Sequence, residues 1–140
     1  MAKIRIGTNV YVYPNPVALL GAVVDGKVNF MPLGWFSRVN ADPPWIGVGV
    51  YRPHHTAKGI RENGAFSLNV PSADLVEAVD YCGLVSGSRI DKSGVFECFF
   101  GELKTAPLVR ACPLCLECRL VRTVELPTND WFIGEIVSAW

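Results

Sequence analysis

Short apolar or alternating segments, separated by turn residues, dominate the hydrophobic pattern of this chain. Residues 45–51 place Ile46, Val48 and Val50 at every second position with small glycines between them, which is typical of a buried strand. Asp25 and Gly26 favour the positive φ angles of a tight hairpin turn. The segments expected to form strands are residues 16–24, 27–30, 45–51, 65–70, 114–123 and 131–137.

Two short segments have helical character. The first, residues 56–63, begins with Thr56, a good N-cap residue, and stops before Gly64, which favours the end of a helix. Ser72 is expected to cap the second, residues 73–81, whose acidic residues lie near its positive end.

The segment 31–40 is interrupted by Pro32 and Gly34 and is expected to be irregular. No repeat or linker divides the chain, so residues 1–140 are expected to form one domain. Many strands and few helices predict a mainly β fold, a barrel with short helices packed outside it.

Composition limits the classes of function. The chain has 140 residues, half of them apolar and 19% charged, which suits one hydrophobic core and excludes a disordered chain. Thirteen basic residues balance thirteen acidic ones, so no net field attracts nucleic acid or a membrane surface. No apolar stretch approaches the ~18 residues of a membrane span, and residues 1–6 lack the apolar core of a signal peptide. With an odd number of cysteines, these features predict a cytoplasmic protein without nucleic-acid or membrane partners.

Three cysteines raise the question of a metal centre. Cys112, Cys115 and Cys118 have the spacing of the first three ligands of a ferredoxin-type cluster, but Arg122 stands where the fourth ligand belongs. In a strand, Cys115 and Cys118 point to opposite faces. We therefore expect no metal here.

The start of the first helix could hold a phosphate. The first turn of a helix leaves backbone N–H groups unpaired, and Thr56 adds a hydroxyl there. Arg52, His54, His55 and Lys58 lie close in sequence. The alternative is that Thr56 only caps its helix and that the charged residues are solvated.

The segment 29–37 could bind a flat ring. An irregular loop offers backbone groups to the polar edge of a ring, and Met31 and Trp35 could cover its face. Alternatively, Trp35 is simply a core residue. The loop 86–92, with its glycine, serines and two cations, could wrap an anion or merely carry solvated charges.

No catalytic motif stands out. The chain has no Walker A loop, dinucleotide glycine fingerprint or zinc-protease motif, and neither histidine has the sequence neighbours of a nucleophilic triad. We therefore expect no catalytic side chain.

Taken in order, a series of short motifs resembles the flavin reductase-like family of FMN-binding split barrels, and within it the flavoredoxins. The matching pieces are residues 14–17 (Pro-Asn-Pro-Val), 29–35 (Asn-Phe-Met-Pro-Leu-Gly-Trp), 42–44 (Asp-Pro-Pro), 56–70, 81–87 (Tyr-Cys-Gly-Leu-Val-Ser-Gly), 91–92 (Asp-Lys), 106–107 (Ala-Pro), 116–118 (Leu-Glu-Cys) and 133–137 (Ile-Gly-Glu-Ile-Val).

The resemblance implies a homodimer of six-stranded antiparallel split β-barrels of Greek-key type, with one FMN per subunit. It implies that Asn29 and the backbone of residues 31–33 bind the flavin ring, that Trp35 lines the pocket, and that Thr56 and Lys92 hold the phosphate. The full set of cofactor-binding residues that it implies is Asn29, Met31, Pro32, Leu33, Trp35, Ser37, Arg52, Thr56 and Lys92.

The chain also departs from the family pattern. The family often has a histidine near the flavin before the strand that begins at about residue 131, where this chain offers Asp130 or Trp131. Ser93 replaces a usual aromatic residue after the Asp-Lys pair. Relatives usually continue beyond Trp140, so the C-terminal part of the family pattern is expected to be missing.

The resemblance implies an oxidoreductase in which NAD(P)H reduces FMN, which passes electrons to free flavin, a metal complex or a redox protein. One alternative is an electron carrier that binds FMN without using a nicotinamide directly. A further alternative is a non-enzymatic barrel that binds heme or another ligand.

Overall fold

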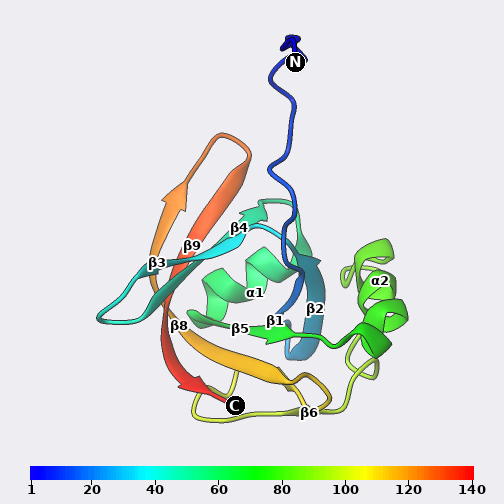
Figure 1. The fold of residues 1–140 in the computed structure, drawn as a ribbon. Coiled ribbons are helices and arrows are strands. Elements are labelled where there is room, and N and C mark those ends of the chain that lie inside the picture. The colour runs from blue at the N-terminus through cyan, green and yellow to red at the C-terminus, as the bar shows by residue number, and fades with distance from the viewer.

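The computed structural model describes residues 1–140 and contains one curved antiparallel sheet and two helices (Figure 1). The strands are β1 (Ala18–Val24), β2 (Lys27–Leu33), β3 (Phe36–Asn40), β4 (Trp45–Tyr51), β5 (Ala65–Val70), β6 (Cys98–Phe99), β7 (Leu108–Val109), β8 (Leu114–Glu125) and β9 (Asn129–Ala139). The helices are α1 (His55–Asn63) and α2 (Val76–Leu84), and a 3-10 turn, η1 (Ala73–Leu75), leads into α2. The seven-stranded sheet has the order β2-β1-β5-β8-β9-β4-β3, and β6 and β7 form a separate ribbon.

The predicted mainly β split-barrel fold with short flanking helices is confirmed, but the sheet has seven strands instead of six. The extra strand is β3, which lies in the segment expected to be irregular and pairs with β4. Pro32 does not interrupt β2, because β2 is an edge strand and the backbone of an edge strand needs a partner on one side only. The irregular segment therefore shrinks to the short connection between β2 and β3.

The hairpin between β1 and β2 confirms the turn prediction and sets the register of the first functional segment. Asp25 and Gly26 have φ angles of 51° and 76°, the left-handed conformation that such a turn requires. Pairing from this turn places Asn29 opposite Ala22 and Met31 opposite Leu20.

The sheet buries both of its faces, because alternate residues of its strands enter different cores. One core holds Leu20 of β1 and Cys118 of β8 together with Ile60 of α1. The other holds Leu19 of β1 and Cys115 of β8 beneath α2 and the loop of residues 85–97 that follows it. Both helices are thus fixed by apolar packing on opposite faces of one sheet, and α1 fills the curl of the sheet (Figure 1).

Gly59 allows α1 to approach β1 closely. A Cβ atom at this position would collide with the backbone carbonyl oxygen of Val23 and with the side chain of Val24. We therefore expect Gly59→Ala to lower the free energy of unfolding by about 1–3 kcal/mol, although alanine is the better helix former. Urea denaturation measures this change. Gly94→Ala is the control, because a Cβ there meets nothing within 4 Å; equal stability of the two variants would contradict the close contact.

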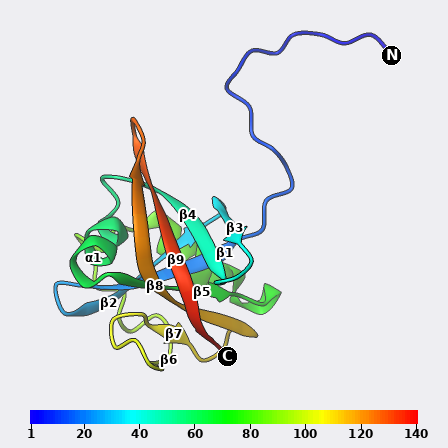
Figure 2. The ribbon, with the colours of Figure 1, turned by 90° about the vertical axis from the view of Figure 1, so that its left-hand side faces the viewer.

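A buried carboxylate ties the tall β8–β9 hairpin, seen in Figure 2, to the rest of the protein. Asp130, the second residue of β9 and close to the turn of this hairpin, is 3% exposed and accepts hydrogen bonds from Arg52 Nε (2.8 Å) and Arg61 Nε (3.1 Å). Arg61 also lies over the ring of Phe132, 5.6 Å from its centroid. These contacts join the end of β4 and the helix α1 to the hairpin.

Candidate functional site

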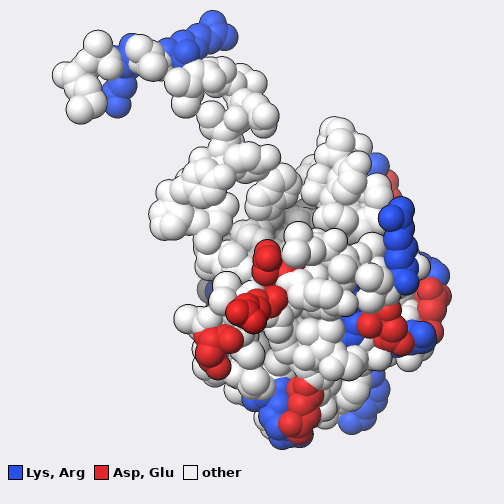
Figure 3. Space-filling view, turned by 90° about the vertical axis from the view of Figure 1, so that its right-hand side faces the viewer, with Lys and Arg blue, Asp and Glu red and all other residues white.

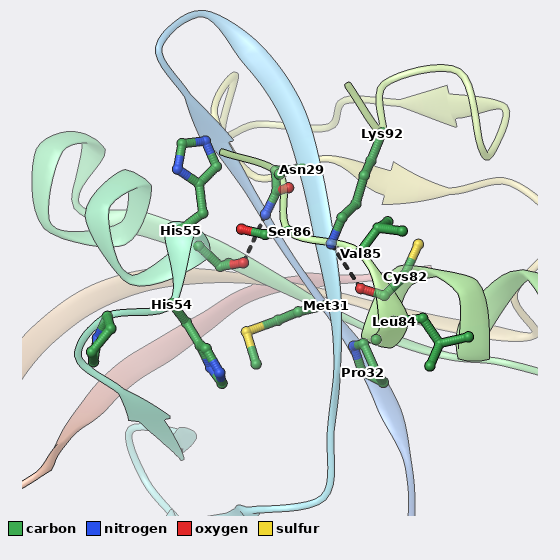
Figure 4. Close-up of a pocket in the computed structure, with 14 residues that line it drawn as sticks. Asn29, Met31, Pro32, His54, His55, Cys82, Leu84, Val85, Ser86 and Lys92 are labelled. Atoms are coloured by element: carbon green, nitrogen blue, oxygen red, sulfur yellow. Dashed lines mark hydrogen bonds between the residues drawn. The ribbon is translucent and has the colours of Figure 1, made fainter. Parts of the chain in front are cut away.

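A cavity of about 340 Å³ lies where β2, the beginning of α1 and the end of α2 meet (Figure 4). Its size falls within the ~300–1,000 Å³ of small-molecule and cofactor sites. The lining residues are Asn29, Met31, Pro32, Pro53, His54, His55, Thr56, Cys82, Gly83, Leu84, Val85, Ser86, Gly87 and Lys92.

Asn29 and Thr56 form the buried polar wall of this cavity. The Nδ2 of Asn29 donates a hydrogen bond of 2.7 Å to the hydroxyl of Thr56, as Figure 4 shows. Asn29 is 4% exposed, and its side-chain oxygen Oδ1 has no hydrogen-bond partner. A buried amide oxygen without a partner is costly, so this atom is suited to accept a hydrogen bond from a ligand.

Lys92 brings a buried positive charge to the same wall. Its side chain is 4% exposed, and Nζ donates to the carbonyl oxygens of Phe30 (3.0 Å) and Cys82 (2.7 Å). No carboxylate lies within 4.0 Å of Nζ. Burial lowers the pKa of Lys92 from its ordinary value. An ammonium group has three donors, so one remains for an anion in the cavity.

His54 lies at the rim of the cavity, where its ring packs edge-on against Tyr51 with the centroids 5.5 Å apart. Burial, and secondarily the charge of Lys92, lower the pKa of His54 below its ordinary 6.5. We expect NMR titration to find this pKa below 6.5 and to find it raised in Lys92→Met. A pKa that is the same in both proteins would mean that Lys92 and His54 do not interact.

A second cavity of about 220 Å³ adjoins the first. Both are lined by Asn29, His55, Gly87 and Lys92. A Cβ atom at Gly87 would overlap the amide of Asn29, so glycine is needed where the loop after α2 meets β2. The two spaces together suit an elongated ligand better than a compact one.

The structure brings together five of the nine cofactor-binding residues expected from the sequence. Asn29, Met31, Pro32, Thr56 and Lys92 line the larger cavity.

The other four do not line it. Leu33 is buried in the first core, and Trp35 is 49% exposed with its ring 6.4 Å from that of Tyr11. Ser37 bonds the neighbouring Arg38 carbonyl on β3, and Arg52 bonds Asp130. The expected convergence of Trp35 and Thr56 on one cavity is therefore absent.

The prediction that Thr56 caps its helix is wrong. His54 is the N-cap, α1 begins at His55, and the Thr56 hydroxyl accepts the hydrogen bond from Asn29 instead. Ser72 makes no side-chain capping bond either, and it precedes η1. Gly64 does end α1, with a φ of 63°.

Sequence reasoning missed the contribution of α2. The sequence predicted that this helix ends at residue 81 and that a loop follows, whereas α2 extends to Leu84, and residues 82–85 at its end line the cavity. The signals for this side of the site were the family motif at residues 81–87 and the loop 86–92, which could wrap an anion. Neither Asp130 nor Trp131 lines the cavity; Trp131 packs against Gly47 and Gly49.

The cysteines lie apart from this cavity except for Cys82. All five are free. Cys115 and Cys118 enter different cores, so the prediction that they point apart is confirmed. Cys112 lies in the same core as Cys115, so Cys118 is on the opposite face of the sheet from both.

Neither helix is long and apolar enough to span a bilayer.

Residues 10–140 match the model of the flavin reductase-like domain, and the chain belongs to that family. An uncharacterized protein from Archaeoglobus fulgidus is 31% identical over 129 residues, which cover 91% of this chain and 72% of the relative. The crystal structure of flavoredoxin from Methanosarcina acetivorans is 59% identical with a TM-score of 0.98, covering 100% of this chain and 75% of that one. An FMN-binding protein from Thermus thermophilus is 26% identical with a TM-score of 0.90, covering 100% and 81%.

Proposed function

We propose that this chain binds FMN in the cavity between β2, α1 and α2 and transfers electrons through it. The observation that carries the proposal is Lys92, a buried cation on the cavity wall without a carboxylate partner. An anionic ligand would neutralise this charge, and the phosphate of FMN is such an anion. The unpaired amides in the first turn of α1 provide further donors beside it.

The other end of the cofactor would be a ring with a polar edge. The unpartnered Oδ1 of Asn29 can accept a hydrogen bond from a ring N–H, and Met31 and Pro32 offer apolar cover. The bound flavin would supply the redox chemistry, while the protein orients it and tunes its potential. The FMN-binding relative from Thermus thermophilus supports this assignment.

Two functions are compatible with FMN binding here, and they differ in the molecule that donates electrons to the flavin. Similarity to flavoredoxin at 59% identity supports an electron carrier that receives its electrons from a redox protein. Membership of the flavin reductase-like family supports the second candidate, direct oxidation of NAD(P)H. In both, the electron acceptor would be a free flavin, a metal complex or a protein.

Anaerobic mixing separates the two functions. The FMN-loaded protein is mixed with NADH or NADPH, and the flavin absorbance is followed. Bleaching at a rate useful for turnover identifies the reductase, whereas bleaching only after addition of a reduced protein donor identifies the carrier. A purified protein that is colourless and does not take up FMN would overturn both.

A further inference from the structure

The first 17 residues form an arm that extends away from the body of the protein (Figures 1 and 2). Its isoleucines are largely exposed, Ile4 by 82% and Ile6 by 73%, and the aromatic and valine residues that follow are exposed as well. Lys3 and Arg5 flank these isoleucines, and the arm contains no acidic residue. An exposed apolar segment of this length indicates a contact surface.

The outward face of α2 is acidic, whereas the arm is basic, and like the arm it exposes apolar side chains. Val76, Glu77, Asp80, Tyr81 and Leu84 all lie on this face and are exposed. Residues 72–88 contain three acidic residues and no basic one.

Figure 3 shows the two surfaces together. Acidic side chains gather on the face of the body that carries α2, and the basic side chains of the arm lie at its far end. Complementary charge of this kind steers association and selects a partner.

The arm is long enough to reach another molecule. A fully extended segment of 17 residues spans at most about 56–61 Å, more than the width of a small domain. The flavoredoxin structure matches all of this chain with a TM-score of 0.98, which requires its N-terminal segment to extend in the same direction. The extended arm is thus a shared feature of two related chains.

We propose that two copies of this chain exchange their arms, and that the arm of each copy docks on α2 of the other. Ile4 and Ile6 would cover the apolar residues of the helix, while the long side chains of Lys3 and Arg5 reach its acidic residues. Leu84 lines the mouth of the cavity described above, so the partner's arm would also form part of its rim. The homodimer implied by the family resemblance would then have a defined interface.

Charge reversal tests this exchange without relying on the proposed cofactor. One variant carries Lys3→Glu and Arg5→Glu in the arm, and the other carries Glu77→Lys and Asp80→Lys in α2. Each variant alone would present like charges at the interface, and we expect its dimer dissociation constant in sedimentation experiments to rise about 100-fold. All four positions are exposed, so both variants should fold, as circular dichroism would verify.

Mixing the two variants distinguishes exchange between copies from docking of an arm on its own chain. In a mixed dimer, the reversed arm meets the reversed helix and the native arm meets the native helix, so we expect the dimer to recover its native affinity. A monomeric native protein, variants that dimerise as tightly as the native chain, or a mixture that remains dissociated would each overturn the proposal.

Discussion

Replacing Lys92 by methionine is expected to weaken FMN binding by about 10- to 100-fold and to affect riboflavin binding much less. Methionine keeps the length of the side chain but removes the buried charge that a phosphate would neutralise. One charge-assisted hydrogen bond contributes about 1.5–3 kcal/mol, which sets the size of the loss. Riboflavin has no phosphate and serves as the ligand control. Titrations of both ligands, followed by flavin fluorescence, measure the difference.

Lys58→Met is the matched control for this substitution. Lys58 lies on the exposed side of α1 and pairs with Asp25 at 2.6 Å, outside the cavity lining. We expect it to bind FMN like the native chain. If Lys92→Met loses both ligands equally while remaining folded, Lys92 does not hold the phosphate.

Asp130→Ala is expected to lower the free energy of unfolding by about 2–4 kcal/mol. The substitution leaves Arg52 and Arg61 without their shared carboxylate, and breaking a buried ion pair is costly. Both arginines are about two-fifths exposed, so water compensates part of the loss. Glu125→Gln, an exposed change in the same hairpin, is the control and should be nearly neutral.

The contribution of Asp130 to the free energy of unfolding should decrease at low pH. Burial alone would raise the pKa of Asp130, but hydrogen bonds from Arg52 and Arg61 outweigh it and hold this pKa below 3.8. The carboxylate therefore stabilises the fold above pH 3.8, and this contribution is lost as the pH falls through the lowered pKa. In urea denaturation, the native chain and Asp130→Ala should differ most at pH 7, and the difference should shrink as the pH falls below 3.8 through the lowered pKa. A difference that does not change with pH would contradict the ion-pair explanation.

Most of the fold follows from local patterns in the sequence. Alternation of apolar residues predicted β4 and β5 at their observed bounds, and the Asp25–Gly26 turn predicted the first hairpin. The pattern failed at β3, because its side chains are mostly exposed and it is held by pairing with β4, an interaction between segments that alternation cannot reveal.

The candidate site was predictable only in part, for a similar reason. Asn29, Thr56 and Lys92 could be singled out by residue type and motif, but they are 27 and 36 residues apart in sequence and meet through the sheet and both helices. A hydroxyl at a helix start predicts a cap, and only the structure reveals that Asn29 engages it. The role of Asp130 was hidden likewise, because its arginine partners come from the turn after β4 and from α1.

Hydrogen–deuterium exchange with and without FMN shows where on the chain FMN binds, and it does so without assuming turnover. Bound FMN is expected to slow exchange in three segments that surround the cavity, residues 29–32, 53–57 and 82–92, and to leave the exposed half of β8 unchanged. If saturating FMN protects none of these segments, or protects only residues outside the cavity lining, FMN does not bind in this cavity.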